Sequence, residues 1–223
     1  MCGRFTLHRP KAEIVAELQP DLWDDQDRYQ PAYNIAPSAN CVVVAAVDGA
    51  RRLGHLRWGL IPSWATDAGI GNRLINARGE TLREKPSFRH LVGRHHCAVL
   101  MDGYFEWQRL GARKVPHLIT RPDGRLLLAA ALWDSWTPAE GDRVRSFTIV
   151  TVNAPPPLAA IHERMPAILR PEDLDAWLTP ASPEAALGLL GPCPEPLRAV
   201  PVSTLVNAPQ NNSPAVLQPL APL

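Results

Sequence analysis

The pattern of apolar and polar residues predicts more strand than helix. Residues 41–47 read CVVVAAV, a run rich in β-branched side chains, and Asp48-Gly49 directly after it is typical of a tight turn. Apolar positions recur over 53–58, so we expect a hairpin here. Further strands are expected over residues 97–109, 115–132 (with a turn at 122–124) and 146–152.

Helical periodicity is confined to short segments. Residues 10–18 (PKAEIVAEL) begin with Pro10 at a helix start and place Ile14, Val15 and Leu18 on one face. Other helix candidates are residues 78–92, 171–178 and 183–190. Because strand and helix blocks do not alternate regularly, the pattern favours an α+β fold over a doubly wound sheet.

Proline shapes the later part of the chain. Three consecutive prolines at 155–157 predict a rigid, irregular loop ahead of residues 161–166. No change in composition marks a linker, so we expect a single domain over residues 1–223. Within it, residues 209–223 are expected to wrap the surface or fray.

Composition indicates an ordinary globular protein, with 46% hydrophobic and 20% charged residues. No apolar run approaches the roughly 18 residues needed to span a bilayer, so we expect a cytoplasmic monomer without membrane contact. The cysteines are widely spread, and neighbours in His95-His96-Cys97 would point to opposite faces of a strand. Reduced thiols, no metal and no cofactor are therefore expected.

Basic residues gather in one part of the chain although the formal net charge is only +1. Residues 51–94 hold eight arginines and Lys85 against Asp67, Glu80 and Glu84. Two interpretations stay open: a surface that contacts phosphates, or a solvated arginine-rich face.

Cys2 would carry both a free amine and a free thiol once Met1 is removed, as methionine aminopeptidases commonly do ahead of a small residue. The two groups ordinarily titrate near roughly pH 8 and 8.5, so both nucleophiles are present at neutral pH. The amine forms a Schiff base with an aldehyde, and the thiol then closes a five-membered thiazolidine. The alternative is that residue 2 is a cysteine by chance.

Glu106 lies in Gly103-Tyr104-Phe105-Glu106-Trp107, where alternation places Phe105 and Trp107 on one face of a strand. If that aromatic face packs inward, Glu106 faces a cleft or solvent. A partly buried carboxylate has a raised pKa and can exchange protons during imine formation. The alternative is an ordinary exposed strand glutamate.

His162 and Asn76 are further candidates. His162 follows the proline-rich stretch and could protonate the ring oxygen of a closed deoxyribose, which helps to expose its aldehyde. Asn76 could hydrogen-bond sugar oxygens or the Cys2 backbone, with Arg78 contacting a phosphate. The alternatives are a histidine without a catalytic role and a turn-forming asparagine beside a surface arginine.

Trp58 and Trp64 bracket a short segment inside the basic region. Exposed tryptophans beside arginines suit stacking on unpaired bases, whereas burial in the core is the commoner fate of tryptophan.

Taken together, these segments resemble the SRAP (SOS response-associated peptidase) family, the abasic-site shields. The resemblance runs along nearly the whole chain and rests on six motifs in order: Met1-Cys2-Gly3-Arg4-Phe5, Tyr33-Asn34-Ile35-Ala36-Pro37, Trp58-Gly59-Leu60-Ile61-Pro62-Ser63-Trp64-Ala65, Ile75-Asn76-Ala77-Arg78, Asp102-Gly103-Tyr104-Phe105-Glu106-Trp107 and His162-Glu163-Arg164-Met165-Pro166.

The resemblance implies a β-barrel-like, bifurcated mixed sheet flanked by helices. It implies that Cys2 joins the abasic deoxyribose, with Asn76, Glu106 and His162 completing the site. By motif match it also implies a DNA surface lined by Arg4, Pro37, Trp64, Arg78, Arg164 and Met165. No DNA contact is carried over to residues 206–213, where the family pattern is blurred.

The resemblance therefore predicts a DNA-repair protein that captures abasic sites in single-stranded DNA by a thiazolidine crosslink, with autopeptidase and lyase-like activity. We expect it to associate with the nucleoid when bound to DNA. Two rival hypotheses are a cysteine peptidase with Cys2 as nucleophile, His162 as base and Asn76 as oxyanion donor, and a non-covalent single-strand binding module.

Overall fold

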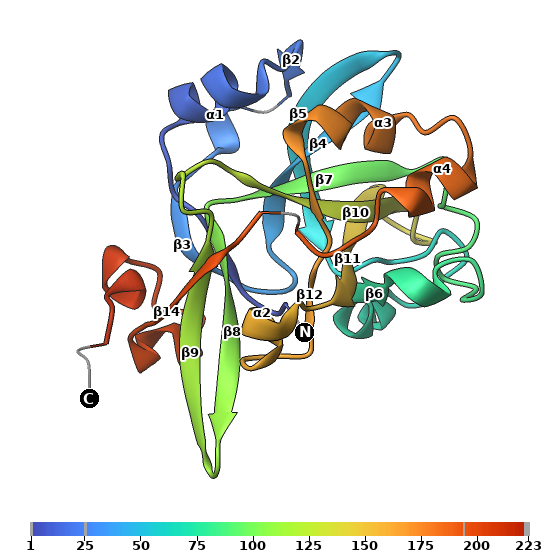
Figure 1. Cartoon of the computed structure of the whole chain (residues 1–223). Helices are drawn as coiled ribbons and strands as arrows, with labels where there is room; N and C mark the ends of the chain where they lie inside the picture. Colours follow the sequence, from blue (N-terminus) through green and yellow to red (C-terminus); the bar gives the residue numbers. More distant parts are fainter. Residues whose placement is uncertain (1, 25, 194, 221–223) are drawn as a thin grey trace.

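Two β-sheets organise the computed structural model, which describes residues 2–24, 26–193 and 195–220 (Figure 1). The larger sheet contains, in spatial order, β12 (Arg164–Pro166), β11 (Val144–Asn153), β10 (Leu127–Trp136), β7 (His96–Met101), β4 (Asn40–Val47), β5 (Ala50–Trp58) and β2 (Leu22–Trp23). In addition, β6 (Asn76–Arg78) pairs with β11, and β13 (Ile168–Leu169) pairs with β10.

The larger sheet closes on itself as a five-stranded barrel. Strand β5 pairs with β4 on one side and runs parallel to β11 on the other, where Phe147 is the partner of Trp58. The rings of these two residues are stacked with centroids 6.5 Å apart, and both side chains are fully buried. The expected barrel-like mixed sheet is therefore confirmed, and its strands contribute many residues to the main apolar cluster.

The smaller sheet has the order β14-β9-β8-β1-β3. Its strands are β14 (Arg198–Pro201), β9 (Arg113–Thr120), β8 (Gly103–Leu110), β1 (Phe5–Leu7) and β3 (Ala32–Ile35). The predicted strand over residues 97–109 is in fact β7 and β8, which belong to different sheets. Asp102 stands between them, and its carboxylate accepts hydrogen bonds from the backbone N–H groups of His8 and Arg9.

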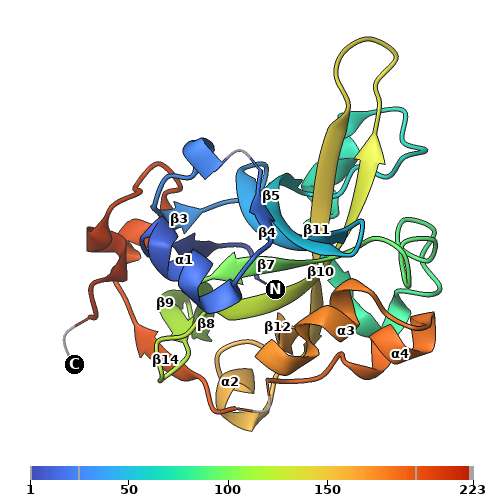
Figure 2. The same cartoon turned by 90° about the horizontal axis from the view of Figure 1, so that it is seen from above.

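Short helices flank the sheets, as expected for an α+β fold (Figure 2). The α-helices are α1 (Lys11–Leu18), α2 (Pro156–Ala159), α3 (Leu174–Leu178) and α4 (Pro183–Gly188). Single 3₁₀ turns cover Gln26–Arg28, Ala68–Arg73, Gly79–Thr81, Pro171–Asp173, Thr204–Asn207 and Pro214–Leu217.

Three local predictions were wrong. Residues 78–92 form a 3₁₀ turn followed by further turns, because Pro86 cannot donate a helical hydrogen bond. Residues 155–157 initiate helix α2, since proline is well suited to the first turn of a helix. On α1, Ile14 and Leu18 are buried as predicted, but Val15 is 42% exposed.

The segment after β14 lies along the smaller sheet. Val202 bridges to Pro219, and the buried side chains of Val206 and Val216 pack with Phe105. Residues 209–220 therefore wrap the surface, and residues 221–223 lie outside the described part. No helix within the described ranges is long and apolar enough to cross a membrane.

Candidate functional site

The N-terminal segment delivers Cys2 into the interior. Strand β1 pairs with β8 so that Phe5 faces Tyr104, and the Phe105 N–H donates to the Arg4 carbonyl at 2.9 Å. This antiparallel register carries residues 2–4 alongside the part of β8 that bears Glu106. The Cys2 side chain is fully buried, and its thiol donates a long hydrogen bond of 3.9 Å to the Arg4 carbonyl.

Asn76 reaches Cys2 from the barrel. It begins β6, which runs parallel to β11, and the neighbouring Ile75 carbonyl accepts a 2.9 Å hydrogen bond from the Trp58 indole N–H. The Asn76 Nδ2 atom donates to the Cys2 carbonyl at 2.7 Å. Its Oδ1 atom is buried and accepts no hydrogen bond from the described residues. One end of this amide therefore holds Cys2, and the other end is an acceptor available to a ligand hydroxyl.

The side chains of Glu106 and Phe105 project from opposite faces of β8. Phe105 is fully buried with Val202 and Val206 in a small apolar cluster, whereas Glu106 is only 4% exposed on the side of Cys2. Burial raises the pKa of the Glu106 carboxyl, and the nearby His162 partly offsets that rise. The alternation predicted from sequence is thus correct, and Glu106 is a buried carboxyl instead of an exposed strand glutamate.

His162 stands at the end of the loop between α2 and β12. The backbone N–H of Arg164 donates to His162 Nδ1 at 2.9 Å. The same Nδ1 atom lies 3.2 Å from the Arg164 carbonyl oxygen, so the backbone of Arg164 fixes the orientation of the ring. The charge coupling between Glu106 and His162 places the two side chains in one electrostatic environment.

The Cys2 thiol is far less acidic than the sequence suggested. Burial raises its pKa, and the negative charge of Glu106 raises it further. The expectation of a thiol titrating near its ordinary value is therefore wrong for the buried site. At neutral pH the sulfur keeps its proton in this conformation.

Tyr104 is a member of the site that the sequence argument did not single out. Its side chain is 1% exposed, and burial raises its pKa well above the usual value, with the charges of Cys2 and Glu106 adding to the rise. The phenol is thus neutral and lies within the same electrostatic environment. Its position two residues before Glu106 on one strand face was the signal that could have identified it.

The residues expected to contact DNA divide into two groups. Trp64 is 54% exposed, Arg78 is exposed and Pro37 is half-buried. Met165, by contrast, is fully buried, and Arg164 is 8% exposed. Neither of these two side chains presents a surface to DNA in this structure.

Arg164 is engaged inside the protein. Its guanidinium donates to both carboxylate oxygens of Glu80, at 2.7 and 2.9 Å, and to Asn153 Oδ1 at 2.7 Å. This bidentate pair joins β12 to the turn after β6. Arg164 therefore ties the His162 loop to the segment that carries Asn76, and the expected phosphate contact is replaced by a structural one.

Arg4 also has internal partners. Its NH1 atom donates to Asn34 Oδ1 and to the Val206 carbonyl, both at 2.8 Å. Asn34 in turn donates to the carbonyls of Val206, Ala208 and Asn211. The segment 206–212, where no DNA contact was carried over, is thus anchored by the first two motifs of the chain.

The two tryptophans of the third motif differ in solvent exposure. Trp58 is fully buried, so of the two interpretations given for it burial in the core is correct. Trp64 is presented by a loop that β10 holds on both sides: the Ser63 N–H donates to Asp134 Oδ2 at 2.8 Å, and the Trp136 indole donates to the Ala65 carbonyl at 2.6 Å. Trp64 is therefore a rigidly mounted aromatic surface.

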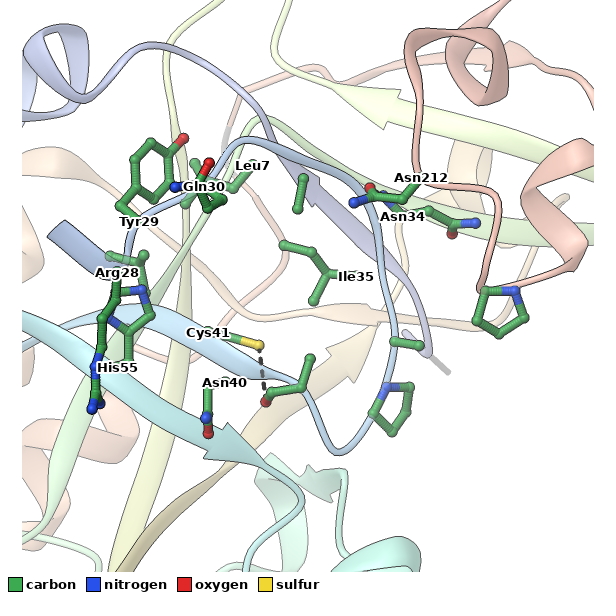
Figure 3. A pocket seen from close by; sticks show the side chains of 16 residues that line it. Leu7, Arg28, Tyr29, Gln30, Asn34, Ile35, Asn40, Cys41, His55 and Asn212 are labelled. Carbon is green, nitrogen blue, oxygen red and sulfur yellow. Dashed lines mark hydrogen bonds between the residues drawn. The ribbon is translucent and has the colours of Figure 1, made fainter. Parts of the chain in front are cut away.

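A cavity of about 650 Å³ lies elsewhere, between β3 and β4 (Figure 3). Its lining includes Cys41, Ile35, Asn40 and Asn212. The Cys41 thiol donates to the Ala39 carbonyl at 3.5 Å, the contact drawn as a dashed line. This cavity is built from residues other than those gathered around Cys2.

Comparison with known proteins gives one consistent result. Residues 1–209 match the family described as SOS response associated peptidase (SRAP). Abasic site processing protein YoqW of Bacillus subtilis is 40% identical over 222 residues, which covers 98% of this chain and 99% of the relative. Abasic site processing protein HMCES of Rattus norvegicus is 32% identical over 269 residues, covering 98% and 76%.

The fold has a counterpart among solved structures. The crystal structure of a protein from Bacteroides thetaiotaomicron superimposes with a TM-score of 0.88 at 27% identity, covering 99% of this chain and 100% of that one.

Proposed function

The chain belongs to the SOS response associated peptidase (SRAP) family, and from this premise we propose that it processes abasic sites in DNA through a covalent bond to Cys2. The relatives named above are abasic site processing proteins and match 98% of this chain. One observation carries the proposal: separate elements bring the buried Glu106 and the half-buried Asn76 and His162 toward the buried Cys2.

The reaction begins at the α-amino group that Cys2 acquires when Met1 is removed. This amine attacks the C1′ aldehyde of the ring-opened abasic sugar, and one water leaves as the imine forms. The sulfur then adds to the imine carbon, the nitrogen gains a proton and a thiazolidine closes. Because burial keeps the thiol protonated, the amine is the first nucleophile and the thiol supplies the second bond together with the proton.

The neighbouring side chains have distinct roles. Glu106, whose pKa is raised by burial, accepts and returns the protons of the amine and of the departing water. His162, whose ring is held at Nδ1 by the backbone of Arg164, donates a proton to the ring oxygen of the closed sugar. Asn76 fixes the Cys2 carbonyl and offers Oδ1 to a sugar hydroxyl.

The DNA enters as a single strand. Trp64 stacks on a neighbouring base, Arg78 contacts a phosphate, and Pro37 lines the path. Arg4 lies at the edge of the site with a guanidinium that is partly committed to Asn34. We do not assign Arg164 or Met165 to the DNA surface, because both are buried.

The crosslink protects the lesion from strand cleavage. Met1 leaves by an aminopeptidase or by cleavage of the Met1-Cys2 bond within this site, which accounts for the peptidase in the family name. Hydrolysis of the thiazolidine back to amine and aldehyde reverses the capture, and the lyase-like activity follows from the imine intermediate. The protein therefore acts as a shield at the nucleoid.

The test is a crosslinking assay with Met1-free protein, verified by mass spectrometry of its N-terminus, and single-stranded DNA containing one abasic site. We expect a heat-resistant protein–DNA band on a denaturing gel and a mass equal to protein plus DNA minus one water. DNA with an intact base at the same position is the control. Equal band formation by Cys2→Ala would contradict the proposal.

A general cysteine peptidase is the weaker candidate. Peptidase cysteines have thiol pKa values well below the usual range, whereas burial and Glu106 raise that of Cys2. We therefore expect no cleavage of unrelated peptides, and any peptidase activity is confined to the protein's own first bond.

A further inference from the structure

Strands β8 and β9 continue past the sheet as a two-stranded ribbon. Figure 1 shows its turn at the lower end of the molecule, beyond the other strands. Arg109 pairs with Lys114 and Leu110 with Arg113, so that Gly111 and Ala112 form the turn. Gly111 has φ +60° with open space around its Cα, and residues 109–114 are all exposed. The ribbon tip is defined here as residues 109–114.

Charge at the ribbon tip is entirely positive. Arg109, Arg113 and Lys114 form no ion pair with the described residues, and residues 107–120 contain no carboxylate. Arg109 and Lys114 are directly opposite each other, an arrangement that destabilises an antiparallel pair. No ion pair with the described residues offsets this repulsion, and a polyanion bound at the protein surface would reduce it.

The ribbon also shares a face with the Cys2 site. Side chains at 106, 108 and 110 alternate onto one side of β8, and Arg113 joins them as the partner of Leu110. Gln108 donates to the Ala160 carbonyl at 3.1 Å, which holds the base of the ribbon against the His162 loop. At about 3.4 Å per residue, Leu110 lies roughly 14 Å along the strand from Glu106.

We propose that the ribbon tip binds the backbone of the lesion-bearing DNA strand, about four nucleotides away from the abasic site. This inference rests on the proposed function and adds a second, lesion-independent contact to it. The spacing follows from the roughly 3.4 Å rise per nucleotide of a stacked strand. Arg113 contacts a phosphate, and Leu110, which is 54% exposed, packs against a sugar or base on the same face. Arg109 and Lys114 project from the other face of the ribbon and contribute only to its positive potential.

The contact is one-sided because the ribbon leaves the site in a single direction. DNA that extends far enough on that flank gains affinity, and DNA that extends only on the other flank does not. Binding at the ribbon tip therefore predicts that DNA affinity increases only when one particular flank exceeds a threshold length. With a general positive surface, affinity would depend on the total length of the DNA alone.

The test measures non-covalent binding by fluorescence anisotropy, using single-stranded oligonucleotides with a tetrahydrofuran abasic analogue, which has no aldehyde. One series has two or eight nucleotides on the 5′ flank, and the other varies the 3′ flank. We expect the Arg113→Ala variant to bind about two- to threefold more weakly when one particular flank is long. The slope of log affinity against log salt should fall by about 0.7 for the one lost contact.

The matched control is Arg143→Ala, which removes the same charge from the turn between β10 and β11. Figure 2 shows that turn at the upper edge of the view, away from β8. We expect it to bind all oligonucleotides like the parent protein. The Arg113→Ala variant should unfold at the parent temperature, since the Arg113 side chain is exposed and forms no ion pair with the described residues.

Equal loss of affinity for short and long flanks, or no loss at all, would overturn the inference. The proposed function is scored separately, by the crosslinking of short oligonucleotides that carry a true abasic site. If the ribbon variant crosslinks these oligonucleotides as the parent does, covalent capture is independent of the ribbon. If the parent protein itself fails to crosslink them, the proposed function is wrong, whatever the anisotropy data show.

Discussion

Cys2 and Cys41 are two buried thiols with different surroundings. Burial raises the pKa of both, and each thiol donates to a nearby backbone carbonyl, Cys2 to Arg4 and Cys41 to Ala39. Cys41 borders a cavity of about 650 Å³ but lies inside strand β4, where its backbone nitrogen is part of the chain. Cys2 has the Glu106 carboxyl and the Asn76 amide near it, and in our proposal its nitrogen becomes a free amine when Met1 is removed.

The comparison shows that neither thiol acidity nor cavity volume explains the reactivity proposed for Cys2. A buried thiol held in its neutral form is a poor nucleophile on its own. The adjacent amine, together with Glu106 as a proton acceptor, is what Cys41 lacks. The predictions below test this difference, beginning with the largest effect.

Replacing the sulfur by oxygen should distinguish the two cysteines most clearly, through its effect on crosslinking. In Cys2→Ser the amine remains and still forms an imine, but the hydroxyl closes a weaker ring, so the heat-resistant DNA band should fall by at least about a hundredfold. Borohydride reduction should restore a band by trapping the imine. Cys41→Ser should crosslink at the parent rate, and a comparable loss in that variant would remove the distinction.

Removal of the Asn76 amide should have the next largest effect. Asn76→Ala loses the hydrogen bond to the Cys2 carbonyl and the Oδ1 acceptor, so we expect the crosslinking rate to fall about 10- to 100-fold. The rate is measured by single-turnover gel quantification. The control is Asn40→Ala, an asparagine that lines the cavity beside Cys41. A parent-like rate for Asn76→Ala would show that Cys2 needs no fixed carbonyl.

Glu106→Gln should slow crosslinking while stabilising the fold. The folded-state pKa of Glu106 is raised above the unfolded value, so its stability contribution is present at low pH and is lost as pH rises through the folded pKa. At pH 7 the glutamine should therefore raise Tm, by roughly 2–4 °C for each 1 kcal/mol gained. Below about pH 4 the difference in Tm should disappear, since the carboxyl is then protonated in both states.

The expected loss of crosslinking rate in Glu106→Gln is about 10- to 100-fold, because proton transfer to and from the amine is impaired. Thermal unfolding monitored by circular dichroism at pH 4 and pH 7 provides the stability measurement. A Tm at pH 7 below that of the parent would mean that the buried carboxylate stabilises the fold, contrary to its raised pKa.

The smallest effect concerns how DNA is presented to Cys2. Asp134 and Trp136 hold the loop on either side of Trp64, so Asp134→Asn and Trp136→Phe should each weaken single-stranded DNA binding about threefold. In a Trp64→Ala background the same changes should have no further effect on affinity. An additive loss in the double variants would mean that these residues act elsewhere than through Trp64.

Much of the fold followed from local patterns. The hairpin of β4 and β5, strand β11 and helices α1, α3 and α4 were predicted, because alternation and helix-start signals act over a few residues. The division of residues 97–109 into β7 and β8 was not. It depends on Asp102, whose carboxylate binds backbone groups of the N-terminal segment, a partner nearly a hundred positions away in the sequence.

By itself the sequence determined which chemistry is possible: a terminal aminothiol, a glutamate on the face of a strand opposite two aromatic residues, and motifs that indicate the family. Only the tertiary structure decided which groups are buried away from solvent. It buried the Cys2 thiol, Arg164 and Trp58, left Trp64 exposed, and joined Asn76 to the Cys2 carbonyl. The reason is that desolvation and charge coupling depend on atoms contributed by distant segments, and no periodicity within one segment encodes them.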